Sequence, residues 1–529
     1  MRKGFWWQVV QVLLGVLIGA LVTLSVVKIR EKQHLVSTRM VQWPKLNLVL
    51  DLLDKHYVDV VDHESVSESA IRATLASLDP HSVYLPPVQL TASEEELAGN
   101  FEGIGIQFNV PNDTAIVLEV IAGGPSEKAG LQIGDRILKV DGETIAGVKF
   151  PQDSMVRRMK GPAGTKVTVT VGRDKEQIPF EITRGKIPQH SVDAAFMIND
   201  QVGYLRLAKF SRTTFDECKK AALELQEKGM KHLLFDVRSN SGGYMDQALL
   251  LSNAFLSIGD TIVYIEGKHR AREVYRADGR GVLQDMGLTV LIGENSASAS
   301  EIFAGAIQDN DRGTIIGRRS FGKGLVQEPF FFSDNSGIRL TVARYYTPSG
   351  RCIQKPYSAA SDYDYDIYRR YTDGEVFSAD SVHLDKSDVH HTRGGREVYG
   401  GGGIMPDVFV PLDTTHTTRF YQQVNAKATP MRFAAALFDR YRARLVAIDS
   451  FPEMDRFLSG IQWKVDFPAY AKARDGISCT EAEWDASESY LLPQLKALVA
   501  RYSQLGENAF YRYYLPIDTT VEAALKQLQ

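Results

Sequence analysis

The sequence has little of several features that would point to familiar chemistry. Only three cysteines occur in 529 residues, Cys218, Cys352 and Cys479, and they lie far apart in the chain. They cannot all pair, so neither a disulfide framework nor a cysteine-rich metal site is indicated. The H-E-x-x-H pattern of zinc peptidases is also missing. The formal net charge of -4 gives no sign of a polyanionic partner, which argues against nucleic-acid binding.

Long apolar runs are also nearly absent, and the one exception lies at the N-terminus. Residues 5–27 form a run of 23 uncharged residues, with basic residues on both sides. As a helix, such a run can span a hydrocarbon core of ~30 Å. No A-x-A-like cleavage site follows it, and it is longer than a signal-peptide core, so an uncleaved anchor over residues 1–32 is favoured over a cleaved signal. The balanced flanking charges do not settle its orientation.

A chain of this length is expected to fold as several domains, because single cores stop growing near ~250–300 residues. Helical spacing predicts a helical region at residues 35–95, and short strands divided by glycine predict a β-rich domain at 96–185. From 186 to 412, strands alternate with helices, which predicts parallel crossovers and an α/β layer fold. Within that domain the polar segment 358–403 is expected to be a long surface insertion. Residues 413–529 are predominantly helical in pattern.

One serine, Ser298, stands where a predicted strand gives way to a predicted helix. The surrounding residues 295–303 follow an apolar run and begin a helical spacing. A serine at such a turn lies at the carboxyl edge of a sheet and at the positive end of the helix, where a developing oxyanion is stabilised. A simple N-cap serine gives the same pattern, so this segment alone leaves both interpretations open.

A serine nucleophile needs a base, and none of the eleven histidines lies in a recognisable triad motif; G-x-S-x-G is absent. Lys323 is the candidate, because glycines and apolar residues surround it and we expect no acid close by. Burial can lower a lysine pKa from ~10.4 towards neutrality, which suits a base. The same lysine completes G-x-x-x-x-G-K. However, Gly324 replaces the Ser or Thr of a phosphate-binding loop, and a strand pattern follows, which disfavours nucleotide binding.

Two segments together resemble the C-terminal processing peptidases, also called tail-specific proteases. These segments are Ser296–Ile302 and Phe321–Gln327. In that family a serine and a lysine form the catalytic dyad, and a glutamine orients the lysine. The resemblance implies Ser298 as nucleophile, Lys323 as general base 25 positions later, and Gln327 as the orienting residue 4 positions further on. This alignment selects Ser298 over the neighbouring Ser296 and Ser300.

The resemblance extends upstream to Asp236–Gly243, which is similar to the family's D-x-R-x-N-x-G-G segment. It implies an oxyanion hole formed by backbone amides of Gly242 or Gly243 together with Ala299. A tight strand-to-helix turn that requires glycine for its geometry would explain the same residues. By the same analogy Glu301 supports the site structurally. The family's core is expected to have ClpP- and crotonase-like α/β layers.

A further resemblance concerns the β-rich domain. Phe101–Ile106 resembles the carboxylate-binding loop of a PDZ domain, and Pro125–Gly147 resembles the rest of such a domain. The implied substrate-binding residues are Gly103, Ile104, Gly105 and Ile106. Amides of such a loop can capture a terminal carboxylate while the peptide adds a strand to the sheet edge. A plain β-rich module without a ligand remains the alternative.

The similarity spans roughly residues 40–412 and ends at the closing segment Gly402–Val408. The insertion at 358–403 and the helices after 413 depart from the simplest family members, and no function is carried over to them. For the rest, the resemblance implies a membrane-anchored serine endopeptidase outside the cytoplasm, in the bacterial periplasm. It would cleave protein substrates recognised by their C-terminal tails, without metal or organic cofactor, and a homo-oligomer is left open.

Two other functions are alternatives to a tail-specific peptidase. The first is a noncatalytic membrane-anchored PDZ scaffold that binds client C-termini. The second is an acyl-CoA hydratase-like enzyme, because related α/β folds stabilise oxyanions with paired amides. The Ser298 and Lys323 pair at matching spacing argues against both.

Overall fold

The computed structural model describes residues 43–357, 363, 365–382, 386–414 and 418–528. They belong to two compact units, Met1–Ser77 and Leu78–Gln529. No helix of these described residues is long and apolar enough to cross a membrane. The predicted anchor at residues 5–27 lies outside them.

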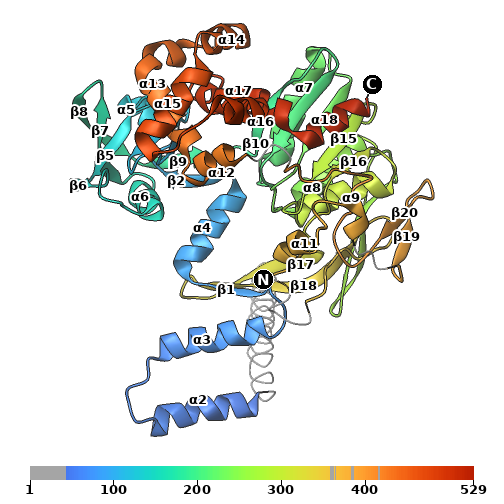
Figure 1. The fold of residues 1–529 in the computed structure, drawn as a ribbon. Helices are drawn as coiled ribbons and strands as arrows, with labels where there is room; N and C mark the ends of the chain where they lie inside the picture. Colours follow the sequence, from blue (N-terminus) through green and yellow to red (C-terminus); the bar gives the residue numbers. More distant parts are fainter. Residues whose placement is uncertain (1–42, 358–362, 364, 383–385, 415–417, 529) are drawn as a thin grey trace, which may run out of the picture. The chain divides into compact units, whose positions relative to one another are not determined.

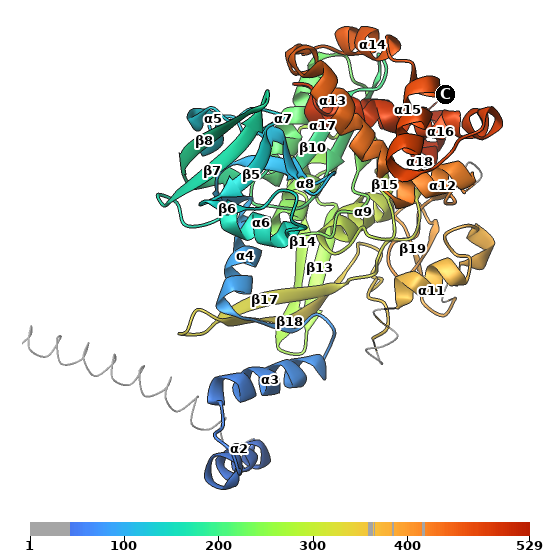
Figure 2. The ribbon, with the colours of Figure 1, turned by 60° about the vertical axis from the view of Figure 1, so that its left-hand side comes forward.

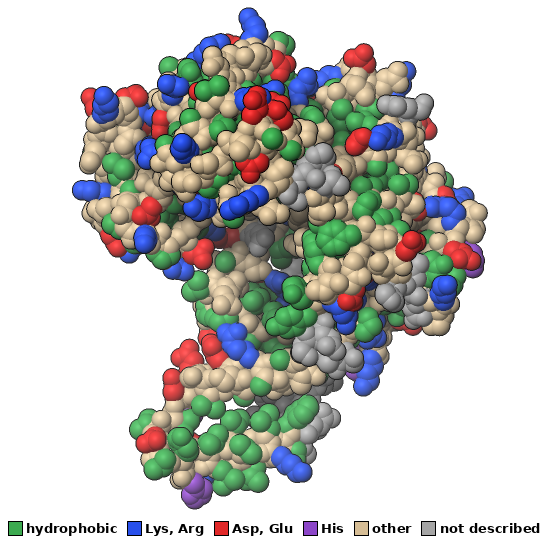
Figure 3. All heavy atoms as spheres, viewed as in Figure 1, with side chains coloured by type: hydrophobic (Ala, Val, Ile, Leu, Met, Phe, Trp, Pro, Cys, Tyr) green, Lys and Arg blue, Asp and Glu red, His purple; other side chains and the backbone are tan. Residues whose placement is uncertain are grey.

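The described part of the first unit consists of two helices, α2 (Pro44–His56) and α3 (His63–Ala76). Asp62 is the N-cap of α3, because its carboxylate accepts hydrogen bonds from the backbone amides of Glu64 and Ser65. Helix α2 has no buried residue, and Figure 3 shows apolar side chains over its surface. This unit therefore contributes a helical pair with a largely exposed apolar helix.

The β-rich domain in the second unit is built around a six-stranded antiparallel sheet with the order β3-β4-β5-β7-β8, in which β6 pairs with β5. Helices α5 and α6 accompany it, and a separate ribbon of β2 and β9 closes it. The elements are β2 (Asn100–Gly103), β3 (Ile106–Asn109), β4 (Ala115–Val120), α5 (Pro125–Ala129), β5 (Arg136–Val140), β6 (Glu143–Thr144), α6 (Gln152–Met159), β7 (Lys166–Arg173), β8 (Glu176–Thr183) and β9 (Gly185–Pro188). Its inward side chains form one apolar core.

The α/β domain has a six-stranded sheet with the order β10-β11-β12-β15-β16-β21. Its first pair is antiparallel and all the others are parallel, as the alternation of strands and helices predicts. The elements are β10 (Val192–Met197), β11 (Val202–Leu207), α7 (Thr214–Glu227), β12 (His232–Asp236), α8 (Met245–Phe255), β15 (Gly287–Ile292), α9 (Ala299–Asp309), β16 (Thr314–Gly317) and β21 (Val408–Phe409). The central strands are almost wholly buried, because helices cover the sheet.

A second, antiparallel sheet was not predicted. It has the order β1-β18-β13-β14, with β17 paired to β18 in a long ribbon (Figure 2). The strands are β1 (Val83–Leu85), β13 (Thr261–Gly267), β14 (Arg270–Arg276), β17 (Leu325–Phe331) and β18 (Gly337–Tyr346). Strand β14 is mostly exposed and charged, so it lacks the apolar alternation by which a strand is recognised.

The segment 358–403 is not purely a surface insertion, and this expectation is corrected. Its described part contains α11 (Asp366–Thr372), a short η1 (Ala379–Ser381) and the hairpin of β19 (Val389–His391) and β20 (Glu397–Tyr399). Arg370 and Glu375 are only 3% and 7% exposed. Buried charges of this kind need partners, and they find them on the loop that carries Lys323.

The C-terminal region is helical, as expected, and packs on the β-rich domain (Figure 1). Its elements are α12 (Arg419–Ala426), α13 (Thr429–Ala447), α14 (Phe451–Ser459), α15 (Trp463–Asp475), α16 (Glu481–Ala500), α17 (Gly506–Tyr514), η2 (Leu515–Ile517) and α18 (Thr519–Lys526). Phe438 of α13 lies so close to Gly134 that an added Cβ would come within 1.9 Å of its ring. Beside it, Arg442 donates to the buried carboxylate of Asp135 at 2.9 Å. These contacts fix the helices against the domain.

Candidate active site

Ser298 is the N-cap residue of α9, at the turn that follows β15. Its backbone has φ 56° and ψ -112°, a conformation that non-glycine residues seldom adopt. Its amide donates to the Glu301 carboxylate at 2.8 Å, one turn into the helix. Strained backbone of this kind is held only where surrounding contacts enforce it, and it is concentrated at functional sites.

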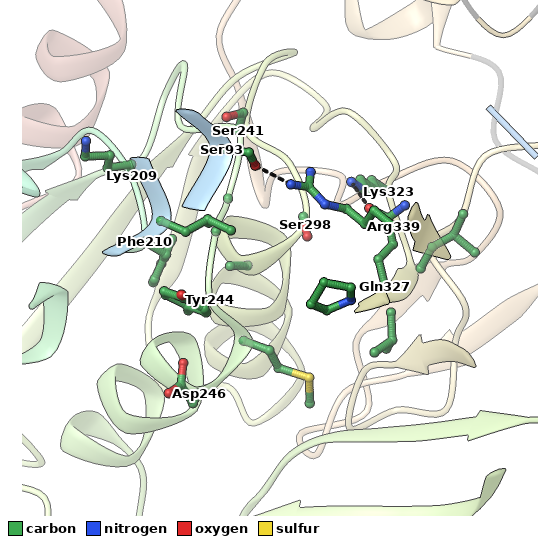
Figure 4. A pocket seen from close by; sticks show the side chains of 18 of the residues that line it. Ser93, Lys209, Phe210, Ser241, Tyr244, Asp246, Ser298, Lys323, Gln327 and Arg339 are labelled. Carbon is green, nitrogen blue, oxygen red and sulfur yellow. Dashed lines mark hydrogen bonds between the residues drawn. The ribbon is translucent and has the colours of Figure 1, made fainter. Parts of the chain in front are cut away.

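Lys323 lies in the loop between β16 and β17 and faces the same cavity as Ser298 (Figure 4). The cavity has a volume of about 670 Å³ and is lined by residues of α4 (Pro87–Ala98), α8, α9, β17 and β18. The Lys323 Nζ donates to Gln327 Oε1 at 2.9 Å, and the Gln327 amide donates in turn to the His81 carbonyl. The structure thus brings Ser298, Lys323 and Gln327 to one cavity.

The environment of Lys323 shifts its titration towards the neutral form. Burial, and after it the nearby Arg339 cation, lower the pKa of Lys323 from 10.5 to about 8, against the opposing charges of Glu301 and Asp79. The expectation that no acid lies nearby is therefore wrong, because Glu301 belongs to α9 and reaches the lysine loop only in the folded chain. Desolvation nonetheless outweighs the two carboxylates.

Glu301 is fully buried and joins the serine turn to the lysine loop. Besides the Ser298 amide, its carboxylate accepts from the Gly322 amide at 2.7 Å, the Lys323 amide at 2.9 Å and the Ser320 hydroxyl at 2.5 Å. Hydrogen bonds to a charged acceptor are the stronger kind. One carboxylate therefore fixes the backbones of both candidate catalytic residues.

The two glycines expected at the oxyanion hole differ in the state of their amides. The Gly242 amide already donates to the Asn240 side chain at 2.9 Å. Among the described residues, no partner is found for the amides of Gly243 and Ala299. A Cβ on Gly242 would lie 2.8 Å from the Cβ of Ser298, so this segment does pass directly beside the serine. The amides of Gly243 and Ala299 are therefore the ones available to donate to an oxyanion. Gly242 instead allows its segment to pass close to Ser298, where a larger residue would not fit.

Sequence reasoning missed two residues that shape this site. The Tyr345 hydroxyl of β18 lies within hydrogen-bonding distance of the carbonyls of both Ser298 and Lys323. Arg339, on the same strand, lines the cavity and donates to Ser93. Both come from the second sheet, and nothing in the local pattern of β18 marks them as cavity residues.

The β-rich domain carries a second, smaller cavity of about 230 Å³ between β3 and α6. Ile104, Gly105 and Ile106 line it, as predicted, whereas Gly103 does not, since it pairs with Gly185 in the ribbon of β2 and β9. The remaining lining residues are mainly apolar: Phe101, Phe108, Gln152, Val156, Met159 and Lys160. The site suits an apolar side chain at the end of an extended peptide.

Among the described residues, no cluster of His, Cys, Asp or Glu side chains could hold a metal ion. The cavity that contains Ser298 is lined by hydroxyl, amine and amide groups besides apolar ones. Its polar groups suit acyl transfer through a side-chain nucleophile.

Comparison with known proteins identifies the two domains that carry these cavities. The model of peptidase family S41 matches residues 201–365, and the model of the PDZ domain matches residues 103–183. A carboxy-terminal-processing protease of Bartonella bacilliformis is 37% identical over 374 residues, which cover 69% of this chain and 83% of that protein. A probable CtpA-like serine protease of Staphylococcus aureus is 34% identical over 352 residues, 66% of this chain and 70% of that protein.

A solved photosystem II D1 C-terminal processing protease is 29% identical, with a TM-score of 0.36, over 69% of this chain and 86% of that one. The extent and identity of the Bartonella bacilliformis match show that the chain belongs to peptidase family S41, as its motifs predicted. It is thus a multidomain protease, serine-type by family, with a PDZ domain ahead of the peptidase core.

Proposed function

We propose that the protein is a serine endopeptidase in which Ser298 is the nucleophile and Lys323 the general base. The observation that carries the proposal is the desolvated Lys323. Its Nζ donates a hydrogen bond to Gln327 at 2.9 Å, in the cavity that Ser298 also lines. A lysine with a pKa of about 8 is partly neutral at physiological pH and can accept a proton.

The reaction is acyl transfer. Neutral Lys323 accepts the hydroxyl proton of Ser298 as the serine oxygen attacks a peptide carbonyl, and the amides of Gly243 and Ala299 stabilise the oxyanion. The resulting ammonium gives its proton to the leaving amine, and the carbon–nitrogen bond breaks. Lys323 then takes a proton from a water that attacks the acyl-enzyme ester, and it gives a proton to the Ser298 oxygen as the bond between the acyl carbon and that oxygen breaks. Gln327, held by the His81 carbonyl, keeps the amine aimed at the serine.

Substrate selection belongs to the PDZ domain. Among the described residues, the amides of Ile104 and Gly105 have no hydrogen-bond partner, and they stand at the mouth of the apolar cavity. Such amides suit a terminal carboxylate, and the cavity suits an apolar terminal side chain. The protein relative named for carboxy-terminal processing supports the same choice of substrate end.

The uncharged run at residues 5–27 anchors the enzyme in a membrane as a single uncleaved helix, with the catalytic part outside the cytoplasm, in the bacterial periplasm. Fractionation of cells that produce the full chain, followed by protease accessibility in intact and opened cells, tests this location. Release of the protein by a salt wash alone would contradict an anchor.

The test of the catalytic assignment compares the full chain with Ser298→Ala and Lys323→Ala on a loosely folded protein that has an apolar C-terminus. Both variants should bind the substrate and fail to cut it. Ser241→Ala is the matched control, since this exposed serine lines the same cavity. If wild type and all variants bind equally and none cuts over a range of pH, the noncatalytic scaffold explains the protein instead. Amidating the substrate C-terminus should weaken binding.

A further inference from the structure

The loop that carries Lys323 has three successive backbone carbonyls directed at one side chain. Arg370 of α11 donates to the carbonyls of Arg319 at 3.3 Å, Ser320 at 2.8 Å and Phe321 at 3.1 Å. Its guanidinium is 3% exposed and also pairs with Asp366 at 2.8 Å. A planar, permanently charged fork of five donors holds several acceptors in one fixed geometry, whereas an ammonium has three donors on a freely rotating group.

The amides of the same loop are held by a second buried side chain. Glu301 accepts from Gly322 and Lys323, immediately after the carbonyls that Arg370 binds. The loop is thus fixed between a buried cation from the 358–403 segment and a buried anion from α9. Because both charges are desolvated, each hydrogen bond is charge-assisted and strong.

Tyr363 and Asp366 of the same segment, together with Lys355 just before it, reach the other end of the hydrogen-bond chain from Lys323 through Gln327 to His81. The Lys355 ammonium lies between the rings of Phe321 and Tyr363, at 3.9 Å and 4.1 Å, and pairs with Asp366 at 3.2 Å. The Tyr363 hydroxyl is 2.5 Å from His81 Nε2, and the carbonyl of His81 is the acceptor for Gln327. The segment therefore supports both the loop of Lys323 and the residue that holds Gln327.

We propose that Arg370, held by Asp366, is a positioning residue that keeps the loop of Lys323 in the geometry required for proton transfer. The segment that contains α11 thereby supports the catalytic loop, although none of its described residues lines the cavity of Ser298. The proposal rests on the proposed function, because it concerns the base of that reaction. It also predicts the pKa of the Lys323 amine, which can be measured without any substrate.

The physical consequence concerns water. If the loop loosens, the Lys323 amine gains solvent, and its pKa rises from about 8 towards the ordinary ~10.4. A rise of about two units lowers the neutral fraction at pH 7 about 10²-fold, and misplacing a catalytic group by ~1 Å has a similar effect. A role confined to stability would change neither the titration of this amine nor the pH profile of cleavage.

The experiment measures the titration directly in the full chain. Brief labelling with acetic anhydride at a series of pH values, followed by mass spectrometry of the peptide that contains Lys323, gives the midpoint of its reactivity. Wild type is compared with Arg370→Met and Arg370→Lys. The matched control is Arg369→Met: this neighbour on α11 also pairs with Asp366, at 3.4 Å, but its side chain is 59% exposed and, among the described residues, has no hydrogen bond to the loop of Lys323. Thermal unfolding and binding of a tail peptide report that each variant is folded.

We expect the midpoint to rise by about two units in Arg370→Met and by about one in Arg370→Lys, and to stay near 8 in Arg369→Met. Cleavage at pH 7 should fall about 10²-fold and about 10-fold in the two Arg370 variants. Folded Arg370 variants that label like wild type overturn the proposal; if Arg370→Met does not fold, Arg370→Lys decides. Absence of cleavage by wild type would instead refute the proposed function, and the labelling result would still stand.

Discussion

Raising the pH from 6 to 9 should activate the protease about 10²-fold, because in the proposed mechanism only neutral Lys323 can accept the Ser298 proton. With a pKa of about 8, the neutral fraction of the amine is about 1% at pH 6, about 10% at pH 7 and about 90% at pH 9. The value of kcat/KM should therefore rise nearly tenfold per unit up to pH ~7 and level off above pH ~9. Without the lowered pKa, activity at pH 7 would be about 300-fold smaller.

The assay follows kcat/KM between pH 5.5 and 10 on a peptide that has no titratable side chain and ends in a free apolar residue. Tail binding is measured at each pH, so that titration of the PDZ site is separated from catalysis. His81 does not confuse the profile: burial, with the Lys323 charge, lowers its pKa to about 4. Ser298→Ala gives the background rate.

Two variants on strand β18 sharpen this test. Arg339→Met removes the cation that, after burial, most lowers the pKa of Lys323, so the midpoint should move to higher pH. Arg344→Met, an exposed arginine on the same strand, should leave the midpoint in place. A midpoint near 6.5 in wild type would indicate a histidine base, and one near 10 would indicate a solvated lysine; either result refutes the reasoning.

Three further predictions concern stability and binding. Lys323→Met should raise the free energy of unfolding by about 3 kcal/mol at pH 7, because the folded variant no longer buries a charge. The pKa of Lys323 is lower in the folded state than in the unfolded state, so this gain should shrink between pH 8 and 10.5 and be absent above pH 10.5. Denaturant titration at a series of pH values measures it. Gly243→Ala should abolish cleavage, because at φ 143° its Cβ would lie 2.0 Å from the Phe210 carbonyl oxygen. The control Gly142→Ala also has a positive φ, but no atom lies within 4 Å of its added Cβ; it should lower the stability measured by thermal unfolding by about 1 kcal/mol and leave kcat unchanged. Val156→Glu in the PDZ cavity should weaken binding of an apolar tail peptide about 10-fold to 100-fold by calorimetry, and Val148→Glu, 54% exposed outside the cavity, should not; equal affinities would argue against this cavity as the tail site.

Much of this protein could be predicted from short stretches of sequence. Three predicted features depend only on residues that are close in the chain: the strand-to-helix turn at Ser298, the glycines beside Lys323, and the helix Pro125–Ala129 with its left-handed Gly130. The parallel sheet follows from the alternation of apolar strands with helices, because the connection length leaves few other arrangements. Spacing and residue type thus determined the family and the main candidate residues.

Other properties of the site depend on which distant segments pack together. The second sheet brings Tyr345 and Arg339 to the cavity, yet the charged pattern of β14 and the mixed pattern of β18 gave no sign of it. Glu301 comes within hydrogen-bonding distance of the lysine loop only through the packing of α9. One local feature was also missed: the Gly242 amide donates to the side chain of Asn240, only two residues earlier, because the motif does not specify this turn geometry.

The sequence by itself determined which residues are available for chemistry: a serine at a helix start, a glycine-flanked lysine with a glutamine four residues further on, and a PDZ domain. Only the tertiary structure decided that this lysine is largely desolvated, which backbone amides remain free, and that an apparent surface insertion supplies Arg370 to the lysine loop. The reason is physical. Residue type fixes the ordinary pKa and the donors of a side chain, whereas the pKa in the fold and the partners of those donors depend on water exclusion and on atoms from distant segments.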